Sequence, residues 1–370
     1  MINTVIVDDS EMVRDVIRDF LEEDGNFNII GEAADGEEGL KIIQDLNPDL
    51  VTSDIEMPKM NGLEMIEIVM SLHPVPIVVI TSHDTAKTAY EATMKGALEF
   101  YPKDIFLKNI SPQKKQNIYD SLKRISGVKA RNAPTAGNFA GSSFLNDFYS
   151  LNVDNKAQEE LTAAAETIQS AVFDASEKQK INMVVLASST GGPKALSKFL
   201  SIMPGDFPLP IAIVQHNSSG FDASFAQWLD AFTQLNVKIA EEGENPSAGN
   251  VYIAQTDKHL ELRNNPDNSG YIFRYNDNEA EQNQKPAADV LFRTAAGSCG
   301  KSLVSVVLTG MGADGAAGTQ KVKEMGGITI AQDEETSLIY GMPKAAFETG
   351  CVDKVLPLEQ IPGELVRLAK

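Results

Sequence analysis

The fold of this chain is constrained most strongly by an alternation of short β-rich runs with segments of helical periodicity. In the first third, β-rich runs are expected at residues 4–7, 49–53, 77–81 and 97–101. Helix-period segments such as 11–23 and 62–72 lie between them. Such alternation is typical of a parallel sheet covered by helices on both faces.

The same alternation returns after residue 181, following a stretch with little to bury. Residues 126–143 are rich in Gly, Ala, Ser and Asn, which is typical of a linker, and a helix is expected over 155–179. We therefore predict two doubly wound α/β domains with parallel sheets, at 1–125 and 181–370, joined by a linker at 126–180. In the second domain, strands are expected at 183–186, 211–215, 251–254, 303–308 and 328–331, and helices at 194–202, 223–232, 316–323 and 343–349.

The charge and cysteine content narrow the class of protein. A formal charge of −20 with no Lys/Arg cluster disfavours binding to nucleic acid or to an anionic membrane surface. Two cysteines, Cys299 and Cys351, are too few for a disulfide framework or a zinc site and favour a reducing compartment. The sequence shows neither a signal-peptide pattern nor 18 consecutive apolar residues, so we expect a cytoplasmic protein without membrane insertion.

Polar residues with complementary chemistry follow the expected strands of the first domain. Asp8 and Asp9 close the first strand, Asp54 and Thr81 close later ones, and Lys103 follows the last. Any one of them fits an ordinary polar strand end. Together they predict a site at the carboxyl edge of the sheet, where Mg²⁺ would offset the crowded carboxylates. Asp54 could then act as a nucleophile toward a phosphoryl group, with Lys103 and Thr81 stabilising the charge that develops.

Three turns of the second domain carry groups suited to nucleophilic catalysis. SSTGG (188–192) leads from a strand into a helix and exposes a hydroxyl, His216 ends the next strand, and Asp314 lies in TGMGADG (309–315). Ser189, His216 and Asp314 would form a triad if one sheet brings the three strand ends together. By itself, SSTGG also fits an N-cap with a glycine turn or a phosphate cradle.

The third turn has a competing interpretation. Gly310, Gly312 and Gly315 form a G-x-G-x-x-G pattern, and Asp333 lies 18 residues beyond it, as in a dinucleotide-binding fingerprint. This interpretation predicts a nicotinamide-dependent oxidoreductase, but it leaves SSTGG and His216 without a role.

The first 120 residues resemble the receiver domain of bacterial response regulators, which is flavodoxin-like. VDDS (7–10), DIEMPKMNG (54–62), Thr81 with Ser82, and FYPK (100–103) carry the resemblance. It implies Mg²⁺ held by Asp8, Asp9, Asp54 and the Glu56 backbone carbonyl, with Asp54 as phosphoacceptor, Thr81 and Phe100 as switch residues and Lys103 as the phosphate-bound cation. Receivers usually have Pro after the Lys, whereas here Asp104 follows and Pro102 precedes.

Residues 181–370 resemble the Rossmann-like catalytic domain of the CheB family of protein-glutamate methylesterases. LASSTGGPKAL, QHNSSGFDASFAQWL, DKHLEL, KPAADVLF, LTGMGADGAAG, IAQDEE and YGMPKAA carry this resemblance. It implies hydrolysis of glutamyl methyl esters on the cytoplasmic helices of chemoreceptors, with methanol released, and often deamidation of receptor glutamines. It also implies a chemotaxis histidine kinase as phosphodonor and no cofactor in the esterase domain.

Carried over position by position, the resemblance makes Ser189 the nucleophile, His216 the general base and acid, and Asp314 its orienter. It makes the backbone N–H groups of Met311 and His216 the oxyanion donors, with Thr190 beside the nucleophile. Two segments depart from the family pattern, Asn217-Ser218 after the histidine and Ala287-Ala288 before Asp289. A non-catalytic adaptor regulated by the receiver is therefore a further alternative to the esterase and the oxidoreductase.

Overall fold

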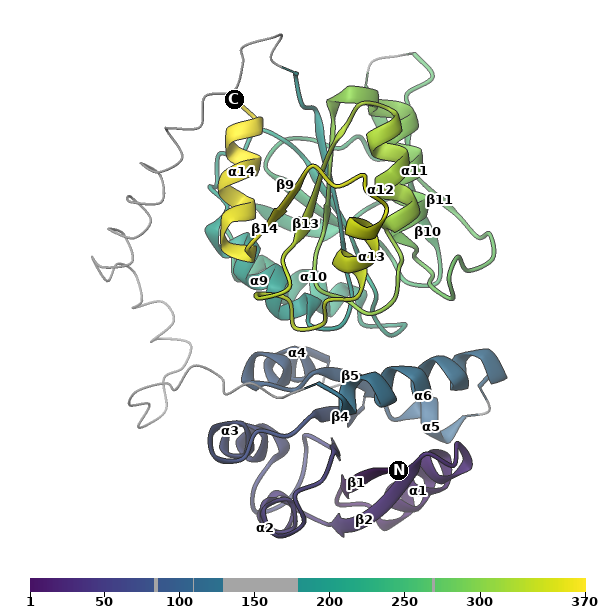
Figure 1. Cartoon of the computed structure of the whole chain (residues 1–370), viewed down its shortest axis with the longest axis vertical. Helices are drawn as coiled ribbons and strands as arrows, with labels where there is room; N and C mark the ends of the chain where they lie inside the picture. The colour runs from purple at the N-terminus through teal and green to yellow at the C-terminus, as the bar shows by residue number, and fades with distance from the viewer. Residues whose placement is uncertain (83–85, 109, 129–178, 268–269) are drawn as a thin grey trace, which may run out of the picture. The chain divides into compact units, whose positions relative to one another are not determined.

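A computed structural model describes residues 1–370 apart from 83–85, 109, 129–178 and 268–269. The first described part is a five-stranded sheet in the order β2-β1-β3-β4-β5, and all of its strand pairs are parallel. Figure 1 shows helices packed along this sheet. Its strands are β1 (Ile2–Val7), β2 (Phe27–Ala33), β3 (Leu50–Ser53), β4 (Ile77–Thr81) and β5 (Glu99–Pro102). Its helices are α1 (Glu11–Glu23), α2 (Gly36–Leu46), α3 (Gly62–Leu72), α4 (Ala86–Lys95), α5 (Asp104–Leu107) and α6 (Pro112–Ser126).

The second described part is a seven-stranded parallel sheet in the order β14-β13-β12-β6-β7-β9-β8, with a separate hairpin of β10 and β11. Its strands are β6 (Met183–Ser188), β7 (Ile211–Gln215), β8 (Asn236–Ile239), β9 (Asn250–Ile253), β10 (His259–Asn264), β11 (Tyr271–Asn276), β12 (Leu303–Val307), β13 (Ile328–Gln332) and β14 (Lys354–Leu356). Its helices are α9 (Gly192–Ile202), α10 (Asp222–Asp230), α11 (Ala288–Cys299), α12 (Ala316–Glu324), α13 (Met342–Glu348) and α14 (Ile361–Leu368).

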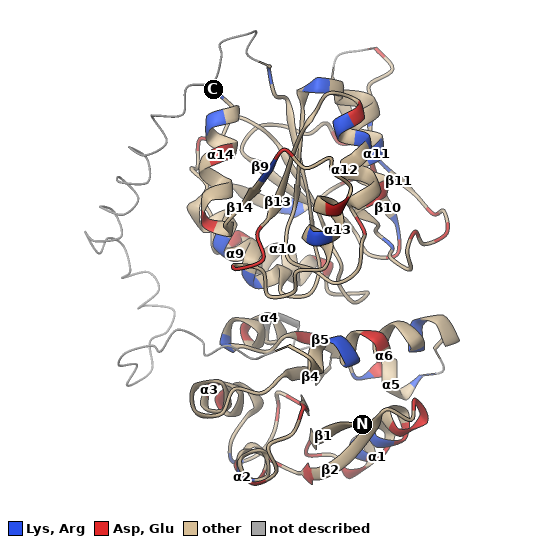
Figure 2. Ribbon diagram, viewed as in Figure 1, with Lys and Arg blue, Asp and Glu red and all other residues tan. Residues whose placement is uncertain are grey.

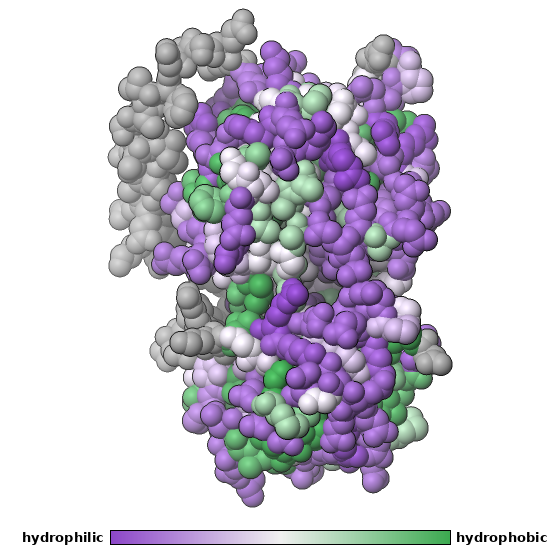
Figure 3. Space-filling view, turned by 45° about the vertical axis from the view of Figure 1, so that its right-hand side comes forward, coloured by the Kyte–Doolittle hydropathy of each residue, from purple (hydrophilic) through white to green (hydrophobic). Residues whose placement is uncertain are grey.

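The central strands β6, β7 and β12 are buried along their whole length, as parallel strands covered on both faces must be. They contain no charged residue, and Figure 2 shows charged residues mainly on helices and loops. The face in Figure 3 is largely hydrophilic, interrupted by apolar patches. Among the described residues, no helix combines the length and the apolarity needed to cross a bilayer.

The predicted α/β class with two parallel sheets is confirmed. Helices α1 and α3 and strands β4 and β7 begin and end where the sequence predicted, whereas β5 occupies Glu99–Pro102 instead of 97–101. Edge strand β2 carried no sequence signal because only its first and last residues are buried, so it lacks an apolar run. The domain boundaries stay predictions, and residues 155–178 of the expected linker helix lie outside the described part of the chain.

Candidate functional sites

The three predicted catalytic side chains lie around the point where the second sheet reverses its strand order. From β6 the chain proceeds to β7 on one side, and β12 lies on the other side of β6. Ser189 follows β6, His216 follows β7, and Asp314 lies in the loop after β12. Ligand sites of open parallel sheets form at the carboxyl ends of strands at such a point. The topology therefore brings all three groups to one edge.

His216 and Asp314 form a buried pair. Nε2 of His216 lies 2.8 Å from Oδ2 of Asp314, and the two side chains are only 7% and 3% exposed. The Asp314 carboxylate also accepts hydrogen bonds from the backbone N–H groups of Ala288 (2.6 Å) and Asp289 (2.9 Å). Burial opposes its ionisation, but these hydrogen bonds and His216 outweigh that effect and lower the pKa of Asp314.

An ionised Asp314 fixes the tautomer of His216. Because a carboxylate only accepts hydrogen bonds, Nε2 of His216 carries the proton and Nδ1 keeps a lone pair. Nδ1 is buried and has no hydrogen-bond partner among the described residues. The histidine is thus oriented with one nitrogen held by the acid and the other available as a base.

The two adjacent serines differ in their availability. Ser188 is fully buried at the end of β6, and its hydroxyl donates to Oε1 of Gln215 at 2.7 Å. Ser189 is partly exposed, and its N–H donates to the Thr309 carbonyl at 3.1 Å. A Cβ at Gly310 would stand 2.9 Å from Cβ of Ser189, so the glycine permits the β12 loop to approach the serine. Of these two serines, Ser189 is the one whose side chain is accessible.

The two backbone N–H groups expected to bind an oxyanion differ in whether they already donate a hydrogen bond. The His216 N–H already donates to the Ser188 carbonyl at 3.1 Å, so it is less available as an oxyanion donor, and that role stays a prediction. It is occupied because His216 directly follows the β6–β7 ladder. The Met311 N–H, by contrast, makes no hydrogen bond within the described part of the chain, and its role stays a prediction.

The glycines of the G-x-G-x-x-G pattern shape the loop that holds Asp314. Gly312 and Gly315 have φ of 90° and 92°, which glycine adopts without strain, and α12 begins directly afterwards. Oδ1 of Asp333, the acid that a dinucleotide site would need, accepts from the N–H and hydroxyl of Thr336 at 2.9 and 2.6 Å. Asp314 within the same loop contacts His216, so the geometry favours the hydrolytic interpretation.

The residues near Asp289 that depart from the family pattern contribute backbone N–H groups, which do not depend on the side chain. Ala288 and Asp289 supply N–H groups to Asp314, and any residue except proline provides those donors. The Ala287 N–H donates to Nδ1 of His259 at 3.1 Å, which makes that buried histidine structural. The Asp289 carboxylate accepts from the Gly318 N–H at 2.6 Å, linking α11 to α12.

The first sheet brings together an acidic cluster. Ligand atoms of Asp8, Asp9 and Asp54 all lie within 4.8 Å of one another. Burial, with the charge of Asp54, raises the pKa of Asp8, although Lys103 partly offsets this. Three crowded carboxylates that are not fully compensated fit a hard divalent cation with oxygen ligands, so the residues present suit Mg²⁺.

Of the remaining receiver positions, Lys103 contacts this cluster directly. Nζ of Lys103 lies 2.8 Å from both Asp8 and Asp54, so the changed proline positions leave its reach intact. Thr81 is buried at the end of β4 and its carbonyl accepts from the Lys103 N–H at 2.8 Å. Phe100 is buried in β5, and Glu56 is exposed just beyond Asp54.

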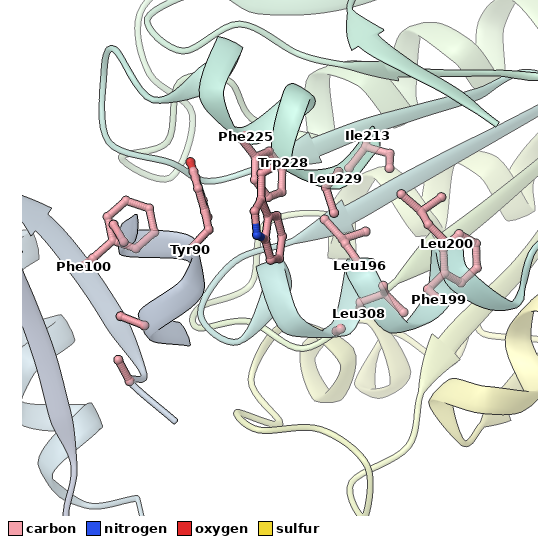
Figure 4. Packing of buried hydrophobic residues seen from close by; sticks show 14 of the residues in the cluster. Tyr90, Phe100, Leu196, Phe199, Leu200, Ile213, Phe225, Trp228, Leu229 and Leu308 are labelled. Carbon is pink, nitrogen blue, oxygen red and sulfur yellow. The ribbon is translucent and has the colours of Figure 1, made fainter. Parts of the chain in front are cut away.

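The structure also reveals contacts that the sequence did not predict, between receiver elements and the catalytic elements. The described residues of 1–128 and 180–370 form one compact unit. Tyr90 of α4 stacks on Trp228 of α10 at 5.3 Å between ring centroids, and Phe100 lies 5.1 Å from Phe221. Figure 4 shows Tyr90 between Phe100 and the pair Phe225 and Trp228.

One polar contact of this kind adjoins the candidate nucleophile. The Thr190 hydroxyl donates to Oε2 of Glu99 at 2.8 Å. Removal of the Glu99 carboxyl from water raises its pKa to about 7, and the Thr190 hydrogen bond only partly opposes this. Thr190 is therefore a site where the receiver directly contacts the neighbour of Ser189.

Comparisons with known proteins agree with this geometry. The chain matches the response regulator receiver domain family over residues 4–112 and the CheB methylesterase family over residues 184–365. The protein-glutamate methylesterase/protein-glutamine glutaminase of Pyrococcus horikoshii is 37% identical over 99% of this chain and 93% of its own length. The protein of the same name from Hydrogenovibrio crunogenus is 36% identical over 100% of this chain and 99% of its own.

A solved structure, the Thermotoga maritima CheB methylesterase catalytic domain, is 42% identical over 51% of this chain and 99% of its own, with a TM-score of 0.49. The fold, the sites and the matched families define a receiver joined to a carboxylic ester hydrolase. More specifically, the chain belongs to the CheB family of protein-glutamate methylesterases. The predicted class of enzyme is thereby confirmed, and an oxidoreductase is not supported.

Proposed function

We propose that this enzyme hydrolyses glutamyl methyl esters on the cytoplasmic helices of chemoreceptors, under control of receiver phosphorylation. The observation that carries the hydrolytic part is the buried His216–Asp314 pair at the strand edge that also holds Ser189. The names of the full-length relatives support glutamyl methyl esters of a protein as the substrate class, and the family resemblance implies the cytoplasmic helices of chemoreceptors. Because such substrates are cytoplasmic, we place the enzyme in the cytoplasm, and its charge of −20 argues against a nucleic-acid partner.

Ser189 acts as the nucleophile. Its Oγ attacks the ester carbonyl while Nδ1 of His216 takes the hydroxyl proton, and Asp314 stabilises the resulting imidazolium. As the tetrahedral intermediate collapses, the bond to the methoxy oxygen breaks. His216 gives its proton to that oxygen, so methanol leaves and an acyl-enzyme remains.

Water completes the cycle. His216 takes a proton from water as it attacks the acyl carbon, then returns that proton to Oγ of Ser189 as the acyl bond breaks. The product is the free glutamate side chain. A glutamine substrate would follow the same steps with ammonia as leaving group, and the relatives' second name, protein-glutamine glutaminase, favours this as a further activity.

The Met311 N–H is our candidate for the oxyanion donor. It lies in the loop after β12 whose Gly310 packs against Ser189, and it makes no hydrogen bond to the described residues. A free N–H at such a place can stabilise the negative oxygen of the tetrahedral intermediate.

Regulation is assigned to the receiver. We infer that a chemotaxis histidine kinase phosphorylates Asp54 and that Lys103 pairs with the phosphoryl group, with Thr81 and Phe100 as the switch residues. Asp8, Asp9, Asp54 and the Glu56 carbonyl would hold Mg²⁺, which when bound offsets the charge of the phosphoryl group. A phosphoryl group adds about −1.5 to −2 charge, enough to bias a two-state contact such as Thr190–Glu99.

Methanol release from membranes bearing methylated receptors tests both parts of the proposal. The full chain should release methanol, and acetyl phosphate should increase the rate. Asp54→Asn should keep the basal rate and lose the stimulation. Absence of methanol release would contradict the esterase proposal and favour a non-catalytic adaptor, whereas equal stimulation of Asp54→Asn would place the switch elsewhere.

A further inference from the structure

The buried side chain of Gln215 joins the nucleophile to the base. Gln215 is the last residue of β7, directly before His216, and the residue is 2% exposed. Its Nε2 donates to two backbone carbonyls, that of Ser189 at 3.0 Å and that of His216 at 2.9 Å. One amide therefore uses both of its N–H groups on the main chain of the two residues that carry the chemistry.

The Gln215 amide connects the two strands just beyond the point where their main-chain hydrogen bonds end. The β6–β7 ladder ends with the pair Ser188 and Gln215, and the His216 N–H to the Ser188 carbonyl is the next main-chain link. Beyond it, Ser189 turns toward α9, where its carbonyl also accepts from the Gly192 N–H at 2.7 Å, and His216 enters a loop. Among the described residues, neither carbonyl accepts a main-chain hydrogen bond from the other strand. The Gln215 amide bridges these two carbonyls and thereby extends the connection between the strands by one step.

Two residues of the SSTGG motif are explained by this amide. The Ser188 hydroxyl donates to Oε1 of Gln215 at 2.7 Å, which fixes the orientation of the amide so that Nε2 faces the carbonyls. Gly192 packs so closely on the amide that a Cβ there would collide with Oε1 of Gln215. The motif thus supplies the nucleophile, a hydroxyl that orients Gln215 and a glycine that leaves room for it.

We propose that Gln215 is a positioning residue that sets the distance between Oγ of Ser189 and Nδ1 of His216 through their backbones. This inference rests on the proposed function of Ser189 and His216. Gln215 touches neither reacting atom, and proton transfer between the two side chains requires them to meet at hydrogen-bond distance. Loss of the bridge should therefore reduce turnover without weakening substrate binding.

Kinetics of the full-length Gln215→Met and Gln215→Glu enzymes test this role, with thermal unfolding to confirm that each is folded. Methionine removes all three hydrogen bonds, and kcat for methanol release should fall roughly 10- to 100-fold with KM changed less than about twofold. Glutamate has the same shape and regains one donor when protonated. The rate of Gln215→Glu relative to Gln215→Met should therefore rise as the pH falls from 8 to 6.

Ser188→Ala provides a second arm that does not depend on the folding of the Gln215 variants. It should lower kcat by roughly 3- to 10-fold, because the amide loses its orienting donor. Ser305→Ala is the matched control, since that hydroxyl is buried in β12 and has no partner among the described residues. The Ser188→Ala/Gln215→Met double variant should be no slower than Gln215→Met, since both changes act through one amide.

The rate of covalent labelling of Ser189 by a fluorophosphonate separates this inference from the receptor assignment. Slow labelling of Gln215→Met and normal labelling of Ser305→Ala would support the positioning role even if the receptor is not the substrate. The proposal is overturned if folded Gln215→Met keeps kcat and labelling within twofold of wild type. It is also overturned if the loss falls on KM, if both Gln215 variants share one pH dependence, or if the two substitutions multiply.

Discussion

The Asp314→Asn substitution probes the geometry of the catalytic pair most severely. Oδ2 of Asp314 accepts from both Nε2 of His216 and the Ala288 N–H, while Oδ1 accepts from the Asp289 N–H. An asparagine has only one acceptor oxygen, so in either orientation its NH₂ group faces a donor. If the NH₂ group faces His216, the imidazole must move its proton to Nδ1, which then cannot accept a proton from Ser189.

The magnitude follows from two effects. Loss of a hydrogen bond between charged groups costs about 1.5–3 kcal/mol in the transition state, where His216 is protonated. The clash of two donors in a buried site, or the change of tautomer that relieves it, costs about 1–3 kcal/mol more. Since about 1.4 kcal/mol is a factor of ten in rate, kcat should fall roughly 10²- to 10⁴-fold.

The assay is steady-state methanol release by Asp314→Asn at neutral pH, together with a thermal unfolding curve. Asp333→Asn is the matched control, because Asp333 is a loop carboxylate after the neighbouring strand β13 that bonds to Thr336 and not to His216. The control should stay near the wild-type rate. A folded Asp314→Asn enzyme within tenfold of wild type would refute the assigned role of the pair.

Three further outcomes follow from contacts elsewhere. Burial of the Glu99 carboxyl raises its pKa to about 7, although the hydrogen bond from Thr190 partly opposes this. The buried arrangement is therefore favoured when Glu99 is protonated and is weakened as pH rises through 7. Basal activity should therefore increase between pH 6 and 8 more steeply in wild type than in Glu99→Gln, and parallel profiles would contradict this. Gly192→Ala should lower kcat at least as much as Gln215→Met, because its methyl group would displace the Gln215 amide; an unchanged kcat would show that the amide tolerates displacement. Removal of Mg²⁺ by a chelator should abolish stimulation by acetyl phosphate and leave the basal esterase rate unchanged, as measured by methanol release.

The fold was predictable from the sequence because its periodicities are local and strong. The predicted bounds are correct for strands β4 and β7 and for helices α1 and α3. Each has a clear apolar run or helical periodicity that ends at polar residues. The triad was predictable because Ser189, His216 and Asp314 each follow a recognisable strand, and parallel strands end at a common edge.

Long-range partners were not predictable in the same way. Nothing local in the sequence indicates that Gln215 bridges two carbonyls, that Tyr90 stacks on Trp228, or that Glu99 meets Thr190, because these depend on contacts between distant segments. The occupied His216 N–H is a similar case, since a sequence match carries over a residue but not the hydrogen bond that its backbone already makes.

In the proposed mechanism Ser189, and not its neighbour Ser188, carries the acyl group. The most direct measurement is methanol release from methylated receptor membranes by full-length Ser189→Ala and Ser188→Ala, with each protein's unfolding temperature as control. Ser189→Ala should lose roughly 10⁴-fold or more in rate. Ser188→Ala should lose only the roughly 3- to 10-fold expected from the loss of the donor that orients Gln215. Near-normal turnover by folded Ser189→Ala would show that Ser189 is not the nucleophile.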